Sequence, residues 1–137
     1  MSLDVRKFDK LLEEGQRRRA ELNKGIERLR ADYEKAGAAV AALQKEKSEV
    51  AQRLTAADKG QLNLSEAELA AAADRVRWLT GAIERARAPW SEAEAALKRA
   101  ENDARGVMQP LKNEAVRGYR HESFEAQEAY EKAWMML

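Results

Sequence analysis

Residues that could carry out chemistry are few in this sequence, and they do not form a catalytic constellation. His121 is the single histidine and there is no cysteine, so one chain can build neither a Cys–His pair nor a histidine-based metal site. The Glu-x-x-His pairs of a di-metal helical bundle and the glycine-rich loop of a phosphate site are also missing. We therefore expect no enzyme, no metal and no cofactor, with His121 on a solvated helix surface.

The basic residues do not indicate a nucleic-acid-binding face. The chain has 25 lysines and arginines against 24 acidic residues, a net charge of +1. Its densest basic run, residues 17–19, splays over roughly 200° of a helix, since successive residues turn by about 100°. No apolar run approaches the roughly 20 residues that span a bilayer. We expect no nucleic-acid partner, no membrane insertion and a cytoplasmic location.

Aromatic and basic residues in two places are candidates for binding a protein. Trp78 comes directly before an apolar stripe position and follows Arg75 and Arg77, the composition of a binding hot spot. The alternative is that Trp78 shields the flank of the first helix. Other candidates are the leucines of a turn and the aromatic residues of the C-terminal tail. The predicted partner-binding residues are Leu62, Leu64, Arg75, Arg77, Trp78, Phe124, Tyr130 and Trp134.

The elements that must position these residues are two long helices. Mostly apolar residues recur at alternating steps of three and four from Val5 to Leu54, a period of about 3.5 that keeps a stripe facing a partner helix. The stripe is Val5, Phe8, Leu12, Gly15, Arg19, Leu22, Ile26, Leu29, Tyr33, Ala36, Val40, Leu43, Lys47, Val50 and Leu54. Arg19 and Lys47 are either tolerated polar positions or residues that fix the register and leave the pairing locally soft.

A turn over residues 58–64 ends the first helix. Gly60 can adopt the left-handed conformation that closes a helix, and Ser65 with Glu68 forms a capping box for the next one. A second stripe follows at the same spacing, so we predict an antiparallel hairpin folded about residue 60, with Leu29 opposite Trp90. That stripe is Leu69, Ala72, Val76, Leu79, Ile83, Ala86, Trp90, Ala93, Leu97, Ala100, Ala104, Val107, Leu111, Glu114 or Ala115, and Gly118.

The predicted fold is therefore all-α: a long antiparallel two-helix coiled-coil hairpin forming a single domain of residues 1–137. Helix one covers about 4–57 and helix two about 65–118, kinked near Pro89 and Pro110 but continuous because the stripe keeps its phase. A helical tail, 119–137, overhangs helix one, which offers it no partner; the tail folds back, frays or awaits another protein. We expect a monomer, although a swapped antiparallel dimer would satisfy the same stripes.

The sequence resembles the central stalk proteins of bacterial type III secretion systems, the YscO/FliJ family. The resemblance covers most of the chain: the opening stretch from Lys7 to Leu12 and on through residues 17–19, the turn at 58–65, and a Trp-containing early second helix at residues 75–79. Length, hairpin topology and the polar, Ala/Glu/Arg-rich character carry it.

The resemblance implies a stalk similar to the γ subunit of rotary ATPases. Its implied partners are a hexameric secretion ATPase, the cytoplasmic domain of the export gate, and chaperones or the needle-length regulator. On that interpretation one end of the hairpin enters the ATPase ring, the turn near Leu62, Leu64 and Trp78 meets the gate, and the protein reaches the inner membrane only through its partners. The alternative is a generic structural coiled-coil scaffold or a fragment of a longer coiled-coil protein.

Overall fold

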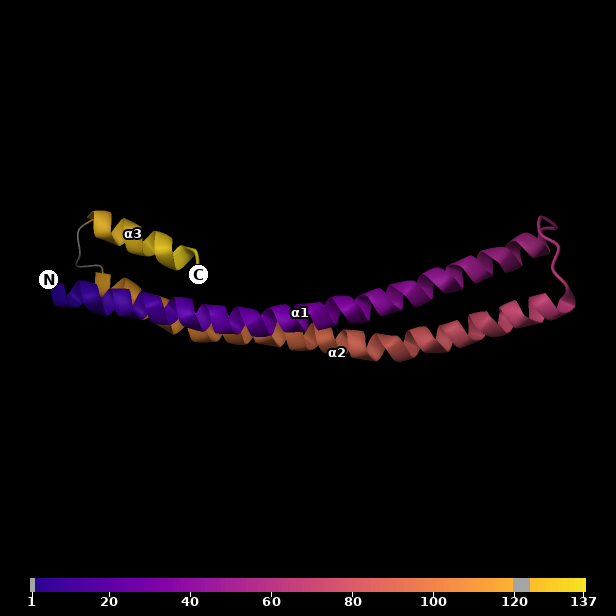
Figure 1. The fold of residues 1–137 in the computed structure, drawn as a ribbon, viewed down its shortest axis with the longest axis horizontal. Coiled ribbons are helices and arrows are strands. Elements are labelled where there is room, and N and C mark those ends of the chain that lie inside the picture. The colour runs from indigo at the N-terminus through magenta and orange to yellow at the C-terminus, as the bar shows by residue number, and fades with distance from the viewer. Residues whose placement is uncertain (1, 120–123) are drawn as a thin grey trace. The chain divides into compact units, whose positions relative to one another are not determined.

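The protein is helical throughout the part of the chain that the structure describes. The computed structural model describes residues 2–119 and 124–137, with side chains for residues 9–118 and 125–137. It contains three helices: α1 (Ser2–Asp58), α2 (Glu66–Tyr119) and α3 (Phe124–Met135) (Figure 1). The two long helices are packed against each other, and the described ranges contain no strand. The prediction of two long helices is confirmed, with each end within two residues of its predicted place.

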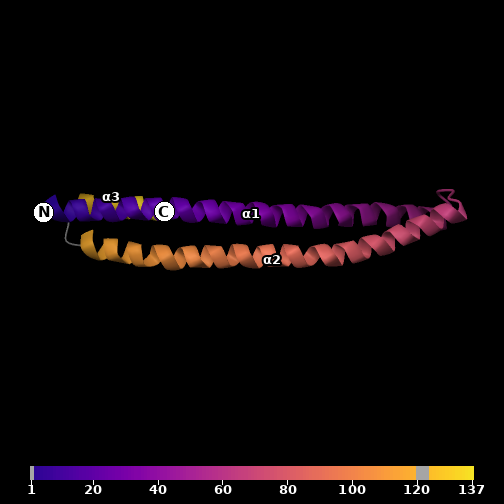
Figure 2. The same ribbon diagram turned by 60° about the horizontal axis from the view of Figure 1, so that its bottom comes forward.

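Two compact units make up the chain. The turn unit is Leu29–Ala96, and the terminal unit combines Met1–Arg28 with Leu97–Leu137. Each contains part of α1 and part of α2, and the terminal unit also contains α3 (Figure 2).

The turn between α1 and α2 is closed by backbone and side-chain hydrogen bonds. Gly60 has a φ of 75°, and its N–H donates to the Ala57 carbonyl at 3.1 Å. The Gln61 N–H donates to the Ala56 carbonyl at 2.9 Å, which completes a Schellman motif. On the other side, Ser65 Oγ accepts the Glu68 N–H at 3.2 Å and caps α2. The predicted turn glycine and serine cap are both confirmed.

In the turn unit, the two stripes bury each other. Every stripe position of α1 from Leu29 to Leu54 is buried or partly buried, and Val40 and Leu79 are closed off almost completely. Contacts join Glu46 to Arg75 and Tyr33 to Trp90, so residue numbers rise on one helix as they fall on the other.

The contacts of Trp90 show that α1 and α2 pair in a register different from the predicted one. Its ring stacks on Tyr33 with centroids 6.2 Å apart, one helical turn beyond the predicted opposite residue, Leu29. Asp58 ends α1 and Glu66 begins α2, so the midpoint of the turn is near residue 62 rather than 60. The indole also lies against Gly37, where an added Cβ would come 2.9 Å from Nε1.

In the terminal unit, α3 packs against both long helices. Met108, Ala115 and Trp134 form a buried cluster, and partly buried apolar side chains surround it. These are Leu11, Leu12, Leu22, Leu111, Val116, Tyr130 and Leu137. The tail therefore folds back, one of the three predicted possibilities, and the expectation that helix one offers it no partner was wrong. The reason is that α3 has an apolar face of its own, which can cover the start of α1.

The second stripe also departs from its predicted course in this unit. Val107 is exposed by 36%, whereas the neighbouring Met108 is buried. The steps from Leu97 through Ala100 and Ala104 to Met108 are three, four and four, an eleven-residue repeat of about 3.67 residues per turn. That period is close to the 3.6 of an undistorted helix, so the buried face of α2 does not keep the strict heptad.

Neither proline divides the second helix. Residues 89 and 110 both lie within α2, which confirms the predicted continuity. Each proline removes one backbone hydrogen bond, and the predicted kinks at these positions stay predictions.

A substitution at Gly15 tests whether the packing of Trp134 there holds α3 in place. A Cβ there would lie 2.8 Å from Cη2 and 3.0 Å from Cζ3 of Trp134, whereas nothing lies within 4 Å of a Cβ at Gly25. Gly25→Ala should therefore stabilise the protein by up to about 1 kcal/mol through helix propensity alone. Gly15→Ala should destabilise it by about 1–2 kcal/mol, because overpacking outweighs the same gain. Thermal unfolding followed by circular dichroism measures both, and a Gly15→Ala protein as stable as Gly25→Ala would show that Trp134 is not seated there.

Candidate functional site

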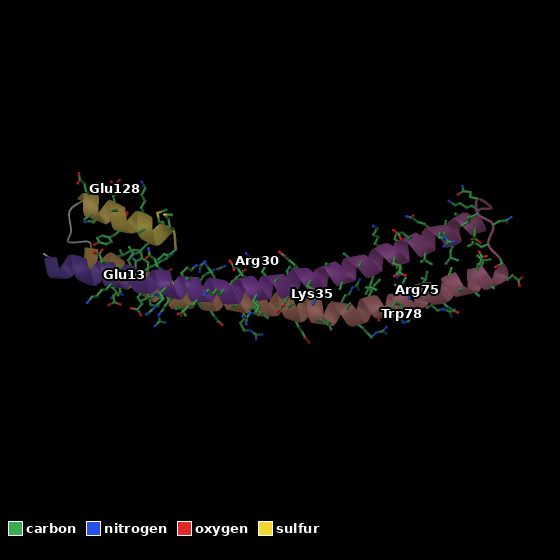
Figure 3. All side chains as sticks on the ribbon, viewed as in Figure 1. Glu13, Arg30, Lys35, Arg75, Trp78 and Glu128 are labelled. Carbon is green, nitrogen blue, oxygen red and sulfur yellow. The ribbon has the colours of Figure 1, made fainter. Side chains whose placement is uncertain are left out.

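Trp78 is the most exposed aromatic side chain among the described residues, with 51% of its surface accessible. It lies on α2 in the turn unit, near Arg75 (Figure 3). The guanidinium carbon of Arg75 is 4.4 Å from the centroid of the Trp78 ring, a cation–π arrangement. The two residues are three apart, so the helix itself brings them to one side.

Glu46 on α1 holds the guanidinium in place. Its Oε1 accepts a hydrogen bond from Arg75 Nε at 2.8 Å and forms an ion pair with Arg75 Nη2 at 2.6 Å. Both side chains are more than 40% exposed, so the pair adds at most about 1 kcal/mol to stability. Its larger effect is on geometry, because a fixed Arg75 restricts the indole beside it.

Arg75 also lines a groove. We call this cavity of about 400 Å³ the Arg75 groove; it lies between the two long helices within the turn unit. It is lined by Val50, Arg53, Leu64, Glu68, Ala71, Ala72 and Arg75. Its walls are mostly aliphatic, with two arginines and one glutamate at the edges. Such a surface can accept an apolar side chain and hold a charge beside it.

The predicted partner-binding residues separate into two groups. Leu64 and Arg75 both line the Arg75 groove, Trp78 lies against Arg75, and Leu62 in the adjoining turn is 37% exposed. Arg77 does not join them, because it pairs with Asp74 on the exposed side of α2.

The tail residues face inward instead. Trp134 is only 3% exposed, and Tyr130 donates a hydrogen bond from its hydroxyl to Asp9 Oδ1 at 3.1 Å. These contacts within the chain occupy the two side chains that were expected to meet a partner. The side chain of Phe124 lies outside the described residues, as does His121.

The run of three arginines at residues 17–19 also has a defined arrangement. Residues 17 and 18 are exposed, with Arg18 paired to Glu14 at 3.4 Å, while Arg19 is partly buried on the stripe. This agrees with the expectation that the three arginines do not form one patch.

Sequence reasoning missed Glu46, Asp9 and the role of Gly15. The signal for Gly15 was available, because a glycine on an apolar stripe marks a place where a large side chain can approach the backbone. Glu46 carried a weaker signal, since it precedes stripe position Lys47 and so lies on the flank of α1. Nothing in the sequence paired Asp9 with Tyr130 across 121 residues.

The described residues supply binding groups more readily than reactive ones. Two threonine hydroxyls of the turn unit donate to their own helix backbone, Thr55 to Ala51 at 3.0 Å and Thr80 to Val76 at 2.8 Å. Across residues 2–119 and 124–137 no group of three or more His, Cys, Asp or Glu side chains is placed to hold a metal ion. Within the same ranges, no helix is long and apolar enough to cross a membrane.

Comparison with known proteins gives no relative for this chain. No family model matches the sequence, and no match was found among curated proteins or solved structures.

Trp78 can be tested as an exposed group without knowledge of a partner. The other tryptophans are a buried one, Trp134, and a partly buried one, Trp90. Trp78→Phe should therefore remove most of the fluorescence that acrylamide quenches, because a collisional quencher reaches only exposed indoles. The matched control, Trp90→Phe, should leave that quenchable fraction in place. Equal quenching before and after Trp78→Phe would mean that this ring is covered in solution.

Proposed function

We propose that this protein is a non-enzymatic adaptor, an antiparallel two-helix coiled-coil hairpin that works by presenting surfaces to other proteins. The observation that carries the proposal is Trp78, half exposed and held by the Glu46–Arg75 pair beside the Arg75 groove. Tryptophan and arginine dominate binding hot spots. A side chain already restricted in the free protein loses less entropy on binding, which raises affinity.

The more specific form of the proposal is a stalk of a type III secretion apparatus. The sequence resemblance supports it, together with the two long packed helices and a turn that carries the exposed Leu62. In this role the chain acts as a monomer and links the secretion ATPase to the cytoplasmic domain of the export gate. Chaperones or the needle-length regulator are further partners. The chain would work in the cytoplasm and meet the inner membrane through those proteins.

A structural scaffold is the second candidate function. The stripes of α1 and α2 favour it, because they bury each other along the helices and leave a surface that is mostly charged. A structural scaffold does not depend on one exposed tryptophan. The two candidate functions therefore differ in how strongly partner binding depends on Trp78.

Binding to the purified ATPase and to the export-gate cytoplasmic domain distinguishes them. Trp78→Ala should weaken binding to one of these proteins by about 30-fold, the loss of roughly 2 kcal/mol that defines a hot spot. The control is Val107→Ala, which truncates an exposed apolar residue in the other unit. Calorimetric titration measures the affinity, and unchanged thermal unfolding shows that each variant is folded.

Three outcomes are possible. Loss of affinity in Trp78→Ala alone supports the stalk and its proposed surface. Equal affinity of both variants would rule out Trp78 as the contact. Failure of the unmodified chain to bind either protein would contradict the secretion role and favour the scaffold.

A further inference from the structure

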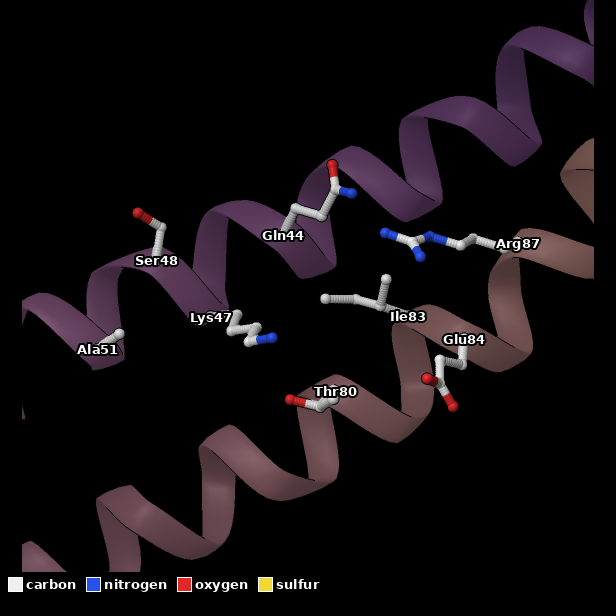
Figure 4. A pocket seen from close by; sticks show the side chains of 8 residues that line it. All are labelled: Gln44, Lys47, Ser48, Ala51, Thr80, Ile83, Glu84 and Arg87. Carbon is white, nitrogen blue, oxygen red and sulfur yellow. The ribbon is translucent and has the colours of Figure 1, made fainter.

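A second groove in the turn unit lies where the apolar stripe of α1 is interrupted. Lys47 takes a stripe position between Leu43 and Val50, and the helices leave a cavity of about 370 Å³ beside it (Figure 4). A lysine ammonium cannot enter a dry core without a partner, so the interruption keeps this part of the interface open. We call this cavity the Lys47 groove. It is lined by Gln44, Lys47, Ser48, Ala51, Thr80, Ile83, Glu84 and Arg87.

Two cations reach into this groove from facing helices. Lys47 on α1 and Arg87 on α2 extend toward the same space in Figure 4, whereas the carboxylate of Glu84 turns away from it. Among the described side chains neither cation has an ion-pair partner. Like charges that face each other in a half-enclosed space repel, and an anion placed between them would relieve that repulsion.

The remainder of the lining favours a side chain over a free ion. Ile83 is buried and lies between the two cations in Figure 4, so the groove has an apolar floor there. Thr80 already donates its hydroxyl proton to the Val76 carbonyl, which leaves the cations, the Gln44 amide and the Ser48 hydroxyl as the donors available. A groove with an apolar floor between two helices suits a third helix that carries both an acidic and an apolar residue.

We propose that the Lys47 groove is a docking site for an acidic helix of a partner protein. A glutamate or aspartate of that helix binds between the two cations, with the Arg87 guanidinium able to grip both carboxylate oxygens. A neighbouring apolar side chain packs on Ile83. The site is distinct from the Arg75 groove and rests on the proposed adaptor role only in that its ligand is a protein.

The test uses the full-length chain and a synthetic helical peptide. The probe is an 18-residue, alanine-rich helix with glutamate and leucine on one face, and its counterpart has glutamine for glutamate. Amide chemical shifts of the isotope-labelled protein, followed at low salt, should move around Lys47 and Arg87 with the glutamate peptide. The glutamine peptide should bind at least tenfold more weakly, because it lacks the charge.

Three variants locate the site and separate its charge from its packing. Lys47→Gln combined with Arg87→Gln should reduce affinity for the glutamate peptide at least tenfold. Lys35→Gln, an exposed lysine elsewhere on α1 in the same unit, should leave that affinity unchanged. Lys47→Leu should raise the Tm by completing the apolar stripe while removing peptide binding.

The outcomes that overturn the proposal are distinct from those that bear on Trp78. Equal binding of the two peptides, shifts confined to other residues, or no binding at all would each exclude an acidic-helix site. Displacement of the glutamate peptide by millimolar inorganic phosphate would assign the groove to a free anion instead. Trp78→Ala should leave peptide binding intact, so failure of the proposed Trp78 surface would not affect this result.

Discussion

The mutual burial of two narrow apolar stripes is the interaction on which the helices of this protein depend. Isolated helices gain little stability in water from propensity alone, and most helical stability in proteins comes from packing an apolar face. Here that face is thin: the buried apolar side chains of the described residues are few and mostly small or aliphatic. They are Ile26, Val40, Leu79, Ala82, Ile83, Ala104, Met108, Ala115 and Trp134. A break in a stripe therefore has a large local effect, as the seat of Trp134 at Gly15 and the cavity beside Lys47 show.

The two kinds of break have opposite results. Glycine removes a side chain and lets a tryptophan lie on the backbone, as Trp134 does at Gly15. Lysine adds a charge that the interface cannot enclose, and a cavity remains beside Lys47. The first kind of break closes the packing, whereas the second leaves it open.

Local signals predicted the fold well, and long-range contacts explain what they missed. The ends of α1 and α2 could be read from Gly60 and Ser65, because a helix cap is set by a few neighbouring residues. The prediction that Val107, and not Met108, belongs to the buried stripe was wrong. It extended a strict heptad into a region where the buried face of α2 follows a period closer to that of an undistorted helix. Gly15 on the stripe indicated a place where a large side chain could approach, but nothing local showed that Trp134, more than a hundred residues away, fills it. Around the Arg75 groove, the sequence indicated Trp78, Arg75 and Leu64, but not the Glu46 carboxylate on α1 that pairs with Arg75.

The separation of contacts along the chain also sets an order of folding. The Glu46–Arg75 pair closes 29 residues, whereas the Tyr130–Asp9 hydrogen bond closes 121, a difference of about 1.3 kcal/mol in loop-closure entropy. The turn unit can therefore form first, and pairing can spread from it toward the ends. Twelve residues are too few for α3 to be a stable helix by itself, so it gains its structure on docking. During synthesis, Leu11, Leu12 and Gly15 leave the ribosome long before α3 and lack its cover until α3 has been made. This apolar surface thus waits for more than a hundred further residues before it is fully protected from other molecules.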